Sequence, residues 1–214
     1  MSAAAALAFL QQLSGISVCQ IADAMGTSVE VDISLRPLDT SFRICAPAFT
    51  VQCEPDDNLT LHHALYLAHP GEALVVSVSG ESRAALWGEL MSVSAQARGL
   101  VGTIVDGAVR DPVEIAALGY PVFARTISPR RAGKDAYGSL NEAIRCGSLT
   151  VHAGDIVVGD ANGILVFPPC QLEEVLRASL EVVRKELALK QQLSEGRTLF
   201  EIAQLAVPEE EPKS

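Results

Sequence analysis

The amino-acid sequence predicts a single domain of the α/β class with an exposed C-terminal helix. Short apolar runs typical of buried strands alternate with helical stretches over residues 43–126. Two closely spaced strand-like runs follow, and one long charged helix comes after them. At 214 residues the chain is long enough for one well-packed core, and no linker or internal repeat divides it.

The elements are expected in the following order. Two short helices come first, at 3–13 and 17–25, each followed by a glycine. Six strands are then expected, at 43–52, 73–78, 101–105, 121–126, 155–158 and 163–167. Helices are predicted between the first four of them, at 58–68, 84–98 and 112–118. This alternation indicates crossover connections with some parallel pairing, whereas the last strands, separated by Gly and Asp turns, indicate an all-β layer. A long helix at 171–195, ended by Gly196, completes the domain.

Composition and charge exclude several classes of protein. The net charge of −10 argues against a nucleic-acid partner, because proteins that bind phosphate backbones normally carry a basic surface. The sequence contains no run of 18 apolar residues, so no membrane span is predicted. The Ala-rich N-terminus lacks the basic residues of a secretion signal. The five cysteines are scattered, which fits a reducing cytoplasmic location better than a disulfide framework. The acidic ending, 207–214, is interpreted as a disordered tail.

The first candidate site is the stretch Asp106-Gly-Ala-Val-Arg110-Asp111-Pro112, which follows the strand-like run 101–105. Parallel strands in α/β folds present functional groups at their carboxyl ends, which is where Asp106, Arg110 and Asp111 are expected. A surface ion pair is the commoner role of an adjacent arginine and aspartate, and Asp-Gly is by itself a favourable turn. The pattern alone leaves both interpretations open.

The second candidate site is the stretch WGELM at 87–91. Gly88 is expected to break or begin a helix, which places Glu89 near a helix N-terminus. The backbone N–H groups of Leu90 and Met91 are then free to bind an anion. The alternative is that Glu89 is only a favourable acidic residue of a first helical turn.

Other polar clusters are weaker candidates. His62 and His63 are adjacent on a predicted helix, so they point to different faces and make a poor metal pair. Residues 159–163 (GDANG) are interpreted as a β-turn before a strand. The common motifs of nucleotide-binding proteins, zinc proteases and serine hydrolases are absent from the sequence.

The residue types at the two candidate sites indicate a chemistry. Two carboxylates with waters are typical of a Mg²⁺ site. A neighbouring arginine suits a small carboxylate or a developing enolate, because its planar group binds pairs of oxygens.

The stretches "WGELMSVSAQARGLVGTIVDGAVRDPVEIAALGYPVFAR" and "HAGDIVVGDANGILVFP" resemble the RraA-like family. Within it they look most like class II pyruvate aldolases acting on 4-hydroxy-4-methyl-2-oxoglutarate and 4-carboxy-4-hydroxy-2-oxoadipate. The resemblance covers residues 17–190, and its specific elements are D-G-x-x-R-D and the upstream G-[DE]-L. It implies a swivelling β/β/α fold assembled as a homotrimer or a dimer of trimers, with active sites between subunits. The chain then divides into an N-terminal helix at 1–16, the aldolase domain at 17–196 and an extension at 197–214.

The resemblance also implies roles for individual residues. Asp111 matches the family's direct ligand of a divalent metal, Mg²⁺, Mn²⁺ or another cation. Arg110 matches the arginine that binds the pyruvyl group and steadies its enolate. Glu89 matches the acid that reaches the metal through a water, with Gly88 beside it and the amides of Leu90 and Met91 receiving the substrate carboxylate.

Two further residues are matched by the same resemblance. Glu186, on the C-terminal helix, matches a glutamate that a neighbouring subunit contributes to the metal's waters. The apolar stripe of this helix must pack either on its own domain or on a neighbour, and the resemblance favours the neighbour. His62 matches a histidine near the pocket. The family's usual acid at position 89 is an aspartate, which is shorter by one methylene.

The expected function is a metal-dependent carbon–carbon lyase that releases pyruvate from a small 2-oxo acid, with oxaloacetate decarboxylase activity at the same site. A non-catalytic trimer that binds and regulates a ribonuclease is the competing interpretation, because some members of the family carry that name. The complete D-G-x-x-R-D element favours the enzyme. A related lyase with another 2-oxo acid as substrate is the third possibility.

Overall fold

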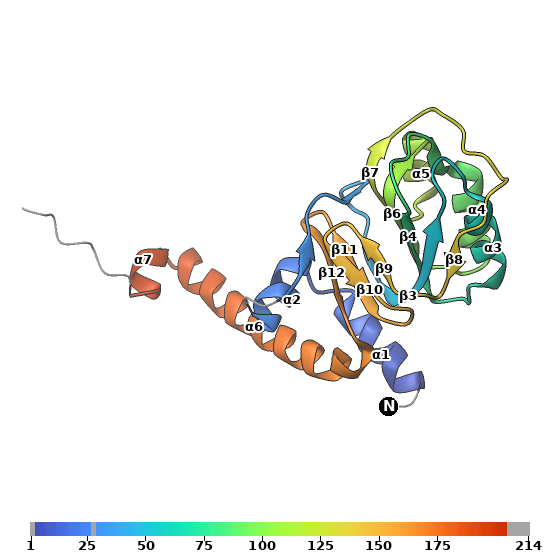
Figure 1. Ribbon diagram of the computed structural model, residues 1–214. Coiled ribbons are helices and arrows are strands. Elements are labelled where there is room, and N and C mark those ends of the chain that lie inside the picture. Colours follow the sequence, from blue (N-terminus) through green and yellow to red (C-terminus); the bar gives the residue numbers. More distant parts are fainter. Residues whose placement is uncertain (1–2, 27–28, 205–214) are drawn as a thin grey trace, which may run out of the picture.

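Parallel strands joined by helices form one half of the structure, as the sequence predicts. The computed structural model describes residues 3–26 and 29–204 (Figure 1), so the expected acidic tail lies outside the described residues. The parallel strands are β3 (Ile44–Cys53), β4 (Ala73–Val78), β6 (Gly102–Val109) and β7 (Val122–Ile127). Their connections contain α3 (Leu59–Leu67), α4 (Glu89–Ala97) and α5 (Pro112–Leu118).

Antiparallel strands form the other half, and β3 belongs to both. Its first part, 44–47, pairs with β11 (Ile156–Asp160), whereas its second part, 48–53, pairs with β4. The hairpin of β11 and β12 (Gly163–Phe167) then pairs with β1 (Val31–Asp32). The main sheet has the order β1-β12-β11-β3-β4-β6-β7-β2, with β2 at Arg36–Pro37. Two short strands join the main sheet, β5 (Ala85–Trp87) beside β6 and β8 (Ser139–Leu140) beside β3. The strands β9 (Ile144–Cys146) and β10 (Leu149–Val151) form a separate two-stranded antiparallel sheet.

Two groups of helices cover the two halves (Figure 1). The helices α3, α4 and α5 lie beside the parallel strands, and α1 (Ala3–Leu13), α2 (Val18–Met25) and α6 (Leu172–Ser194) lie beside the antiparallel ones. A second hydrophobic core forms where these three helices meet β11 and β12. A capping box between Ser17 and Gln20 begins α2, and the positive φ of Gly196 (+92°) follows the end of α6.

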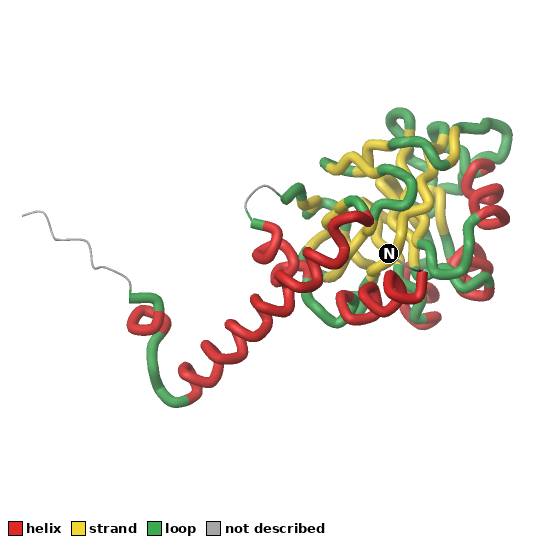
Figure 2. The backbone as a smooth tube through the Cα atoms, turned by 90° about the horizontal axis from the view of Figure 1, so that it is seen from below, coloured by secondary structure: helices red, strands yellow, loops and turns green. Residues whose placement is uncertain are grey.

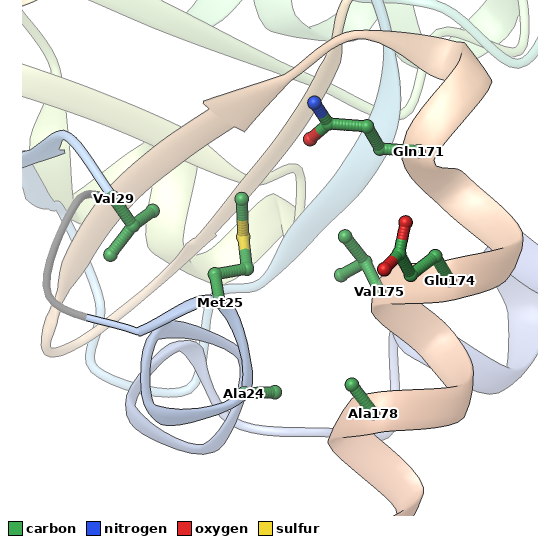
Figure 3. A pocket seen from close by; sticks show the side chains of 7 residues that line it. All are labelled: Ala24, Met25, Val29, Gln171, Glu174, Val175 and Ala178. Atoms are coloured by element: carbon green, nitrogen blue, oxygen red, sulfur yellow. The ribbon is translucent and has the colours of Figure 1, made fainter.

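The apolar stripe of α6 is divided between the chain's own core and solvent. Leu172, Val175 and Leu176 are buried in the second core, so the first half of the stripe packs on its own domain and not on the neighbour that the resemblance favours. Leu187, by contrast, is 61% exposed. The rest of α6 and α7 (Leu199–Ile202) extend away from the body of the protein (Figure 2). A groove of about 400 Å³ lies between α2 and α6, lined by Met25 and Val175 (Figure 3).

Two element boundaries differ from the prediction, and both changes shape the candidate site. Residues 84–98 do not form one helix, because Leu86 and Trp87 are buried in β5, which pairs with β6. The helix α4 begins only after Gly88. The strand predicted at 101–105 continues to Val109, because its second part pairs with both β5 and β7.

The turn predicted within residues 159–163 lies at 161–162, between β11 and β12. Asp160 accepts hydrogen bonds from the backbone N–H of Asn162 at 2.8 Å and from that of Val18 at 3.0 Å. The turn is thereby tied to the start of α2, which is a structural role. All five cysteines are free thiols.

Within the described ranges no single helix is long and apolar enough to cross a membrane. The pair Ala4–Leu13 and Val18–Met25 reaches that length and composition only together, with a bend of 110° between the two helices. Leu13, Val18 and Ile21, on these helices, are buried in the second core.

The buried carboxylate of Asp32 joins β1 to the turn between β9 and β10. Its oxygens accept hydrogen bonds from the backbone N–H groups of Ser34 (2.8 Å), Leu35 (2.9 Å) and Ser148 (2.7 Å). Burial alone would raise the pKa of Asp32, but these bonds outweigh burial and hold the pKa well below its ordinary value.

We expect Asp32→Ala to lower the free energy of unfolding by about 3 kcal/mol near neutral pH, because three buried donors lose a charged acceptor. Since the folded-state pKa is depressed, this stabilisation is present above the unfolded pKa of about 4 and is lost as the pH falls below it. Urea unfolding at pH 7 and at lower pH measures the effect. A constant difference between wild type and variant down to strong acid would contradict it.

Candidate active site

A cavity of about 310 Å³ brings most of the predicted site residues together. It lies between α3, β5, the first turn of α4, the end of β6 and the loop that follows β7. Of the residues predicted from the sequence, Gly88, Leu90, Met91, Arg110 and Asp111 line it, and His62 does so as well. This is the carboxyl end of β6, where a functional group of a parallel sheet is expected.

Asp111 directs its carboxylate into this site rather than to its own helix. It is the N-cap residue of α5, but its side chain makes no capping hydrogen bond. Its Oδ2 atom instead accepts from the backbone N–H of Glu89 at 3.1 Å and from Nε of Arg110 at 3.2 Å. Asp111 also has a left-handed backbone with φ of 57°, which costs a non-glycine residue energy and is typical of functional sites.

Position 88 requires a glycine because there is no room for a Cβ atom, and not because of its backbone angles. Its φ of −161° is extended and open to any residue. A Cβ atom there, however, would lie 2.8 Å from Oδ2 of Asp111 and 2.9 Å from Cγ of Arg110. The side chains of Arg110 and Asp111 therefore lie directly against the Gly88 backbone.

Hydrogen bonds from the buried Trp87 hold this backbone in place. The carbonyl of Trp87 accepts from the backbone N–H of Arg110 at 3.0 Å. Its indole N–H donates to Oγ of Ser92 at 2.8 Å, and that hydroxyl donates to the carbonyl of Gly88 at 3.2 Å. The start of α4 and the end of β6 are thus fixed to each other.

The first turn of α4 is open to an anion, as the sequence predicts. Its first helical bond is donated by Ser92 to the carbonyl of Gly88 at 3.1 Å. The N–H of Glu89 is taken by Asp111. Those of Leu90 and Met91 have no protein acceptor within the described residues, so they can receive a carboxylate beside Arg110.

The cavity also contains residues that the sequence motifs did not identify: Asn58, Arg131 and Lys134. Asn58 donates from Nδ2 to the carbonyl of Leu86 at 2.9 Å, whereas its buried Oδ1 has no partner among the described residues. Burial, and to a smaller extent the charge of Lys134, lower the pKa of His62 below its ordinary value. His62 is therefore neutral at physiological pH.

Asp106 does not belong to this site, which corrects the expectation that it lies at the end of a strand. Because β6 runs to Val109, Asp106 is inside the strand. Its carboxylate accepts from Nε of Arg125 at 2.6 Å and from the backbone N–H of Gly147 at 2.6 Å. These bonds connect β6 to β7 and to the turn between β9 and β10.

Glu186 lies apart from the cavity of its own chain. It is on α6, which packs against α1 and α2. Its Oε2 atom accepts from Nε2 of Gln20 at 2.7 Å and lies 3.7 Å from Nζ of Lys190. Only a neighbouring chain could use this side chain at the site, which stays a prediction.

The donor set at the cavity fits a hard cation that keeps most of its waters. Within residues 3–26 and 29–204 no group of three or more His, Cys, Asp or Glu side chains could hold a metal. Asp111 still offers Oδ1, which accepts no hydrogen bond from the described residues. Glu89 contacts Asp111 through its backbone N–H and is not among the residues that line the cavity, so its contribution to a metal site stays a prediction. A carboxylate or two with waters is the usual environment of Mg²⁺.

Comparisons with known proteins find relatives over most of this chain. The family model described as Aldolase/RraA, RraA-like, matches residues 18–166. A protein of Halalkalibacterium halodurans, provisionally named a 4-hydroxy-4-methyl-2-oxoglutarate aldolase, is 32% identical over 88% of this chain and 90% of its own length.

Solved structures with the same fold carry other titles. An uncharacterized protein from Pseudomonas syringae pv. tomato has a TM-score of 0.82 at 25% identity and covers 93% of this chain and 98% of its own. Streptomyces coelicolor RraAS2, described as an unusual member of an RNase ES inhibitor family, has a TM-score of 0.77 at 22% identity, over 86% and 97% of the two chains. With the family model matching most of its length, this chain belongs to the RraA-like family.

Proposed function

We propose that this protein is a divalent-metal-dependent lyase that cleaves 4-hydroxy-4-methyl-2-oxoglutarate-type 2-oxo acids to pyruvate and also decarboxylates oxaloacetate. The observation that carries the proposal is the meeting of Arg110 and Asp111 at the open first turn of α4, with Gly88 leaving room for both. The similarity to a protein named for this aldolase supports it.

Each side chain has a role that follows from its position. The amides of Leu90 and Met91 bind the carboxylate next to the 2-oxo group, and Arg110 donates to the oxygen on which negative charge develops. Asp111, together with Glu89 through waters, would hold Mg²⁺ or Mn²⁺, which supplies a Lewis acid that draws electrons from the 2-oxo group. The neutral His62 forms part of the wall on the α3 side.

The reaction breaks the bond between C3 and C4 of the substrate. The C4 hydroxyl loses its proton to a water held by Glu89, and its oxygen becomes the carbonyl of the departing product. The electron pair of the broken bond moves to C3, which gives the enolate of pyruvate, and Arg110 stabilises that enolate. A proton returned to C3 completes pyruvate. Oxaloacetate loses its C4 carboxylate as CO₂ and gives the same enolate.

The chelator test decides between this mechanism and a metal-free one. We expect pyruvate release from both substrates to disappear in EDTA and to return with Mg²⁺ or Mn²⁺, because the site offers oxygen ligands and the segment 106–111 contains no lysine for a Schiff base. A coupled assay of pyruvate release measures the rates. Full activity in EDTA, or a covalent adduct trapped by borohydride, would contradict the proposal.

We also propose that the active enzyme is a homotrimer, or a dimer of trimers, in which Glu186 of one subunit acts at the site of the next. The projecting end of α6, with Leu187 61% exposed, supports an interface there. Such a head-to-tail contact closes into a ring.

Mixing inactive chains tests the shared site. Arg110→Ala and Glu186→Ala chains, unfolded together and refolded, should form some sites with all wild-type residues and recover part of the activity. Arg110→Ala mixed with Asp111→Ala is the matched control, because both changes affect the same chain's contribution, and it should recover nothing. Absence of recovery in mixed oligomers confirmed by mass, or a monomer in light scattering, would contradict the shared site.

A further inference from the structure

Asp57 is a buried carboxylate outside the candidate cavity. It is only 6% exposed and is not among the residues that line the cavity. None of the ion pairs among the described residues includes it. Burying a charge without a counter-charge is costly unless hydrogen bonds satisfy it. The groups that satisfy Asp57 therefore show what this side chain holds together.

The two oxygens of Asp57 accept hydrogen bonds from two different segments of the chain. Oδ1 accepts from the backbone N–H of Leu59 at 2.9 Å, at the start of α3. Oδ2 accepts from the backbone N–H of Asp135 at 2.7 Å, in the loop that follows β7. Burial alone would raise the pKa of Asp57, but these bonds and one from the N–H of Ala136 outweigh burial and lower the pKa. The charged carboxylate thus joins the loop to α3.

The backbone of the loop fits closely against Asp57. The N–H of Gly133 donates to the carbonyl of Asp56 at 2.7 Å, and the carbonyl of Gly133 accepts from the N–H of Asn58 at 3.1 Å. A Cβ atom at position 133 would lie 2.9 Å from Oδ2 of Asp57. A larger residue at position 133 would therefore push the loop away from the carboxylate.

Hydrogen bonds, rather than apolar packing, hold this loop. Ala132 is the only buried residue between Ala124 and Ile144. The loop is attached to β5 by the N–H of Ala85, which donates to the carbonyl of Arg130 at 2.8 Å. A segment with so little buried apolar surface is stable only as long as its hydrogen bonds are made.

The two segments that Asp57 joins both line the candidate cavity. The lining residues are Asn58 and His62 on the side of α3, and Arg131, Ala132 and Lys134 on the loop. A shift of the loop relative to α3 would change the width and the charge of the cavity, although no lining residue had been altered.

We propose that Asp57 is a positioning residue, which fixes the loop 130–136 to the start of α3 and so keeps the cavity in the shape that binds the substrate. The inference rests on the proposed function for the identity of that substrate, a 2-oxo acid. Asp57 acts through the loop and touches neither Arg110 nor Asp111.

Trypsin tests the attachment of the loop without any substrate. Asp57→Asn keeps the shape of the side chain but has one acceptor oxygen, so the N–H of either Leu59 or Asp135 loses its partner. Cleavage after Arg131 and Lys134, mapped by mass spectrometry, should become about 10- to 100-fold faster, as expected for the loss of one hydrogen bond to a charged group.

A second variant and two controls separate this effect from a general loss of stability. Gly133→Ala should accelerate the same cleavages, because its Cβ displaces the loop from the other side. Asp155→Asn is the matched control, since Asp155 is also buried but accepts from His152 in the turn before β11. It should leave cleavage in the loop unchanged. Cleavage after Lys190, on the projecting part of α6, is the internal reference and should stay constant in all variants.

Kinetics with oxaloacetate test the consequence for the site. Asp57→Asn and Gly133→Ala should each raise KM about 10-fold, the worth of one hydrogen bond, and change kcat less. The reason is that Arg110 and Asp111 are attached to β5 and α4 and not to the loop.

The outcomes separate this inference from the proposed reaction. Loop cleavage at the wild-type rate in both variants would refute the inference. Faster loop cleavage with a wild-type KM would also refute it, because Asp57 would then hold the loop without serving the site. A wild-type protein that releases no pyruvate, with variants that are cleaved faster in the loop, would refute the reaction and keep Asp57 as the residue that holds the loop.

Discussion

Replacing Arg110 by lysine is expected to lower the turnover of pyruvate release by about 10²–10³-fold, the usual cost of losing a donor to developing negative charge. Lysine keeps the positive charge but cannot keep the bond from Nε to Asp111 while donating to the substrate from a second nitrogen. The loss should be in kcat for oxaloacetate and for the aldol alike, because both reactions pass through the same enolate.

The fold should tolerate this change. The side chain of Arg110 is 43% exposed, and a pair this open to water contributes little to the free energy of unfolding. Arg36→Lys, on the edge strand β2, where the exposed side chain donates among the described residues only to the carbonyls of Ala161 and Asn162, is the control and should keep full activity. If Arg110→Lys and Asp111→Ala both release pyruvate at the wild-type rate, the site is assigned wrongly. A protein whose only role is to bind a ribonuclease would instead release no pyruvate even as the wild type.

The sequence predicts which edge of the sheet carries the candidate site, because the signals for it are local. One signal is an apolar strand followed by Arg110 and Asp111. The other is a glycine before an acid at the start of a helix. Once the strands are taken as parallel, both segments are expected at the same carboxyl edge of the sheet. Asp106 shows the limit of this reasoning. An acid next to glycine looks like the end of a strand, but pairing with β5 and β7 continues β6 past an irregularity between Val105 and Ala108.

The residues that no motif indicated lie on a loop whose position depends on distant contacts. Arg131 and Lys134 reach the cavity because Ala85 and Asn58, far earlier in the sequence, hold the loop by backbone hydrogen bonds. Such bonds leave no pattern in the side chains. Glu186 is a different case, because a helix that extends away from its own chain gives no indication of the surface it meets.

Gly88→Ala is expected to lower the rate of pyruvate release by about 10²-fold or more, although it adds only one methyl group, because misplacement of about 1 Å is that costly in catalysis. The new Cβ would lie 2.8 Å from Oδ2 of Asp111 and 2.9 Å from Cγ of Arg110, so both side chains must move. They are partly exposed and have room to do so, and the extended backbone of Gly88 accepts alanine. Catalysis should therefore fall much more than stability does.

Three measurements on the same preparation test this expectation: the rate with oxaloacetate, the affinity for Mg²⁺ and the melting temperature. Gly80→Ala is the matched control, because the nearest atom to its added Cβ, Cγ of Pro55, is at an ordinary 3.6 Å. We expect Gly88→Ala to bind Mg²⁺ more weakly and to melt close to the wild-type temperature. Wild-type rates in Gly88→Ala would mean that the contact among Gly88, Arg110 and Asp111 has no part in the reaction. A large fall in melting temperature with unchanged Mg²⁺ affinity would instead make Gly88 a structural residue, since a displaced Asp111 could not bind the metal as before.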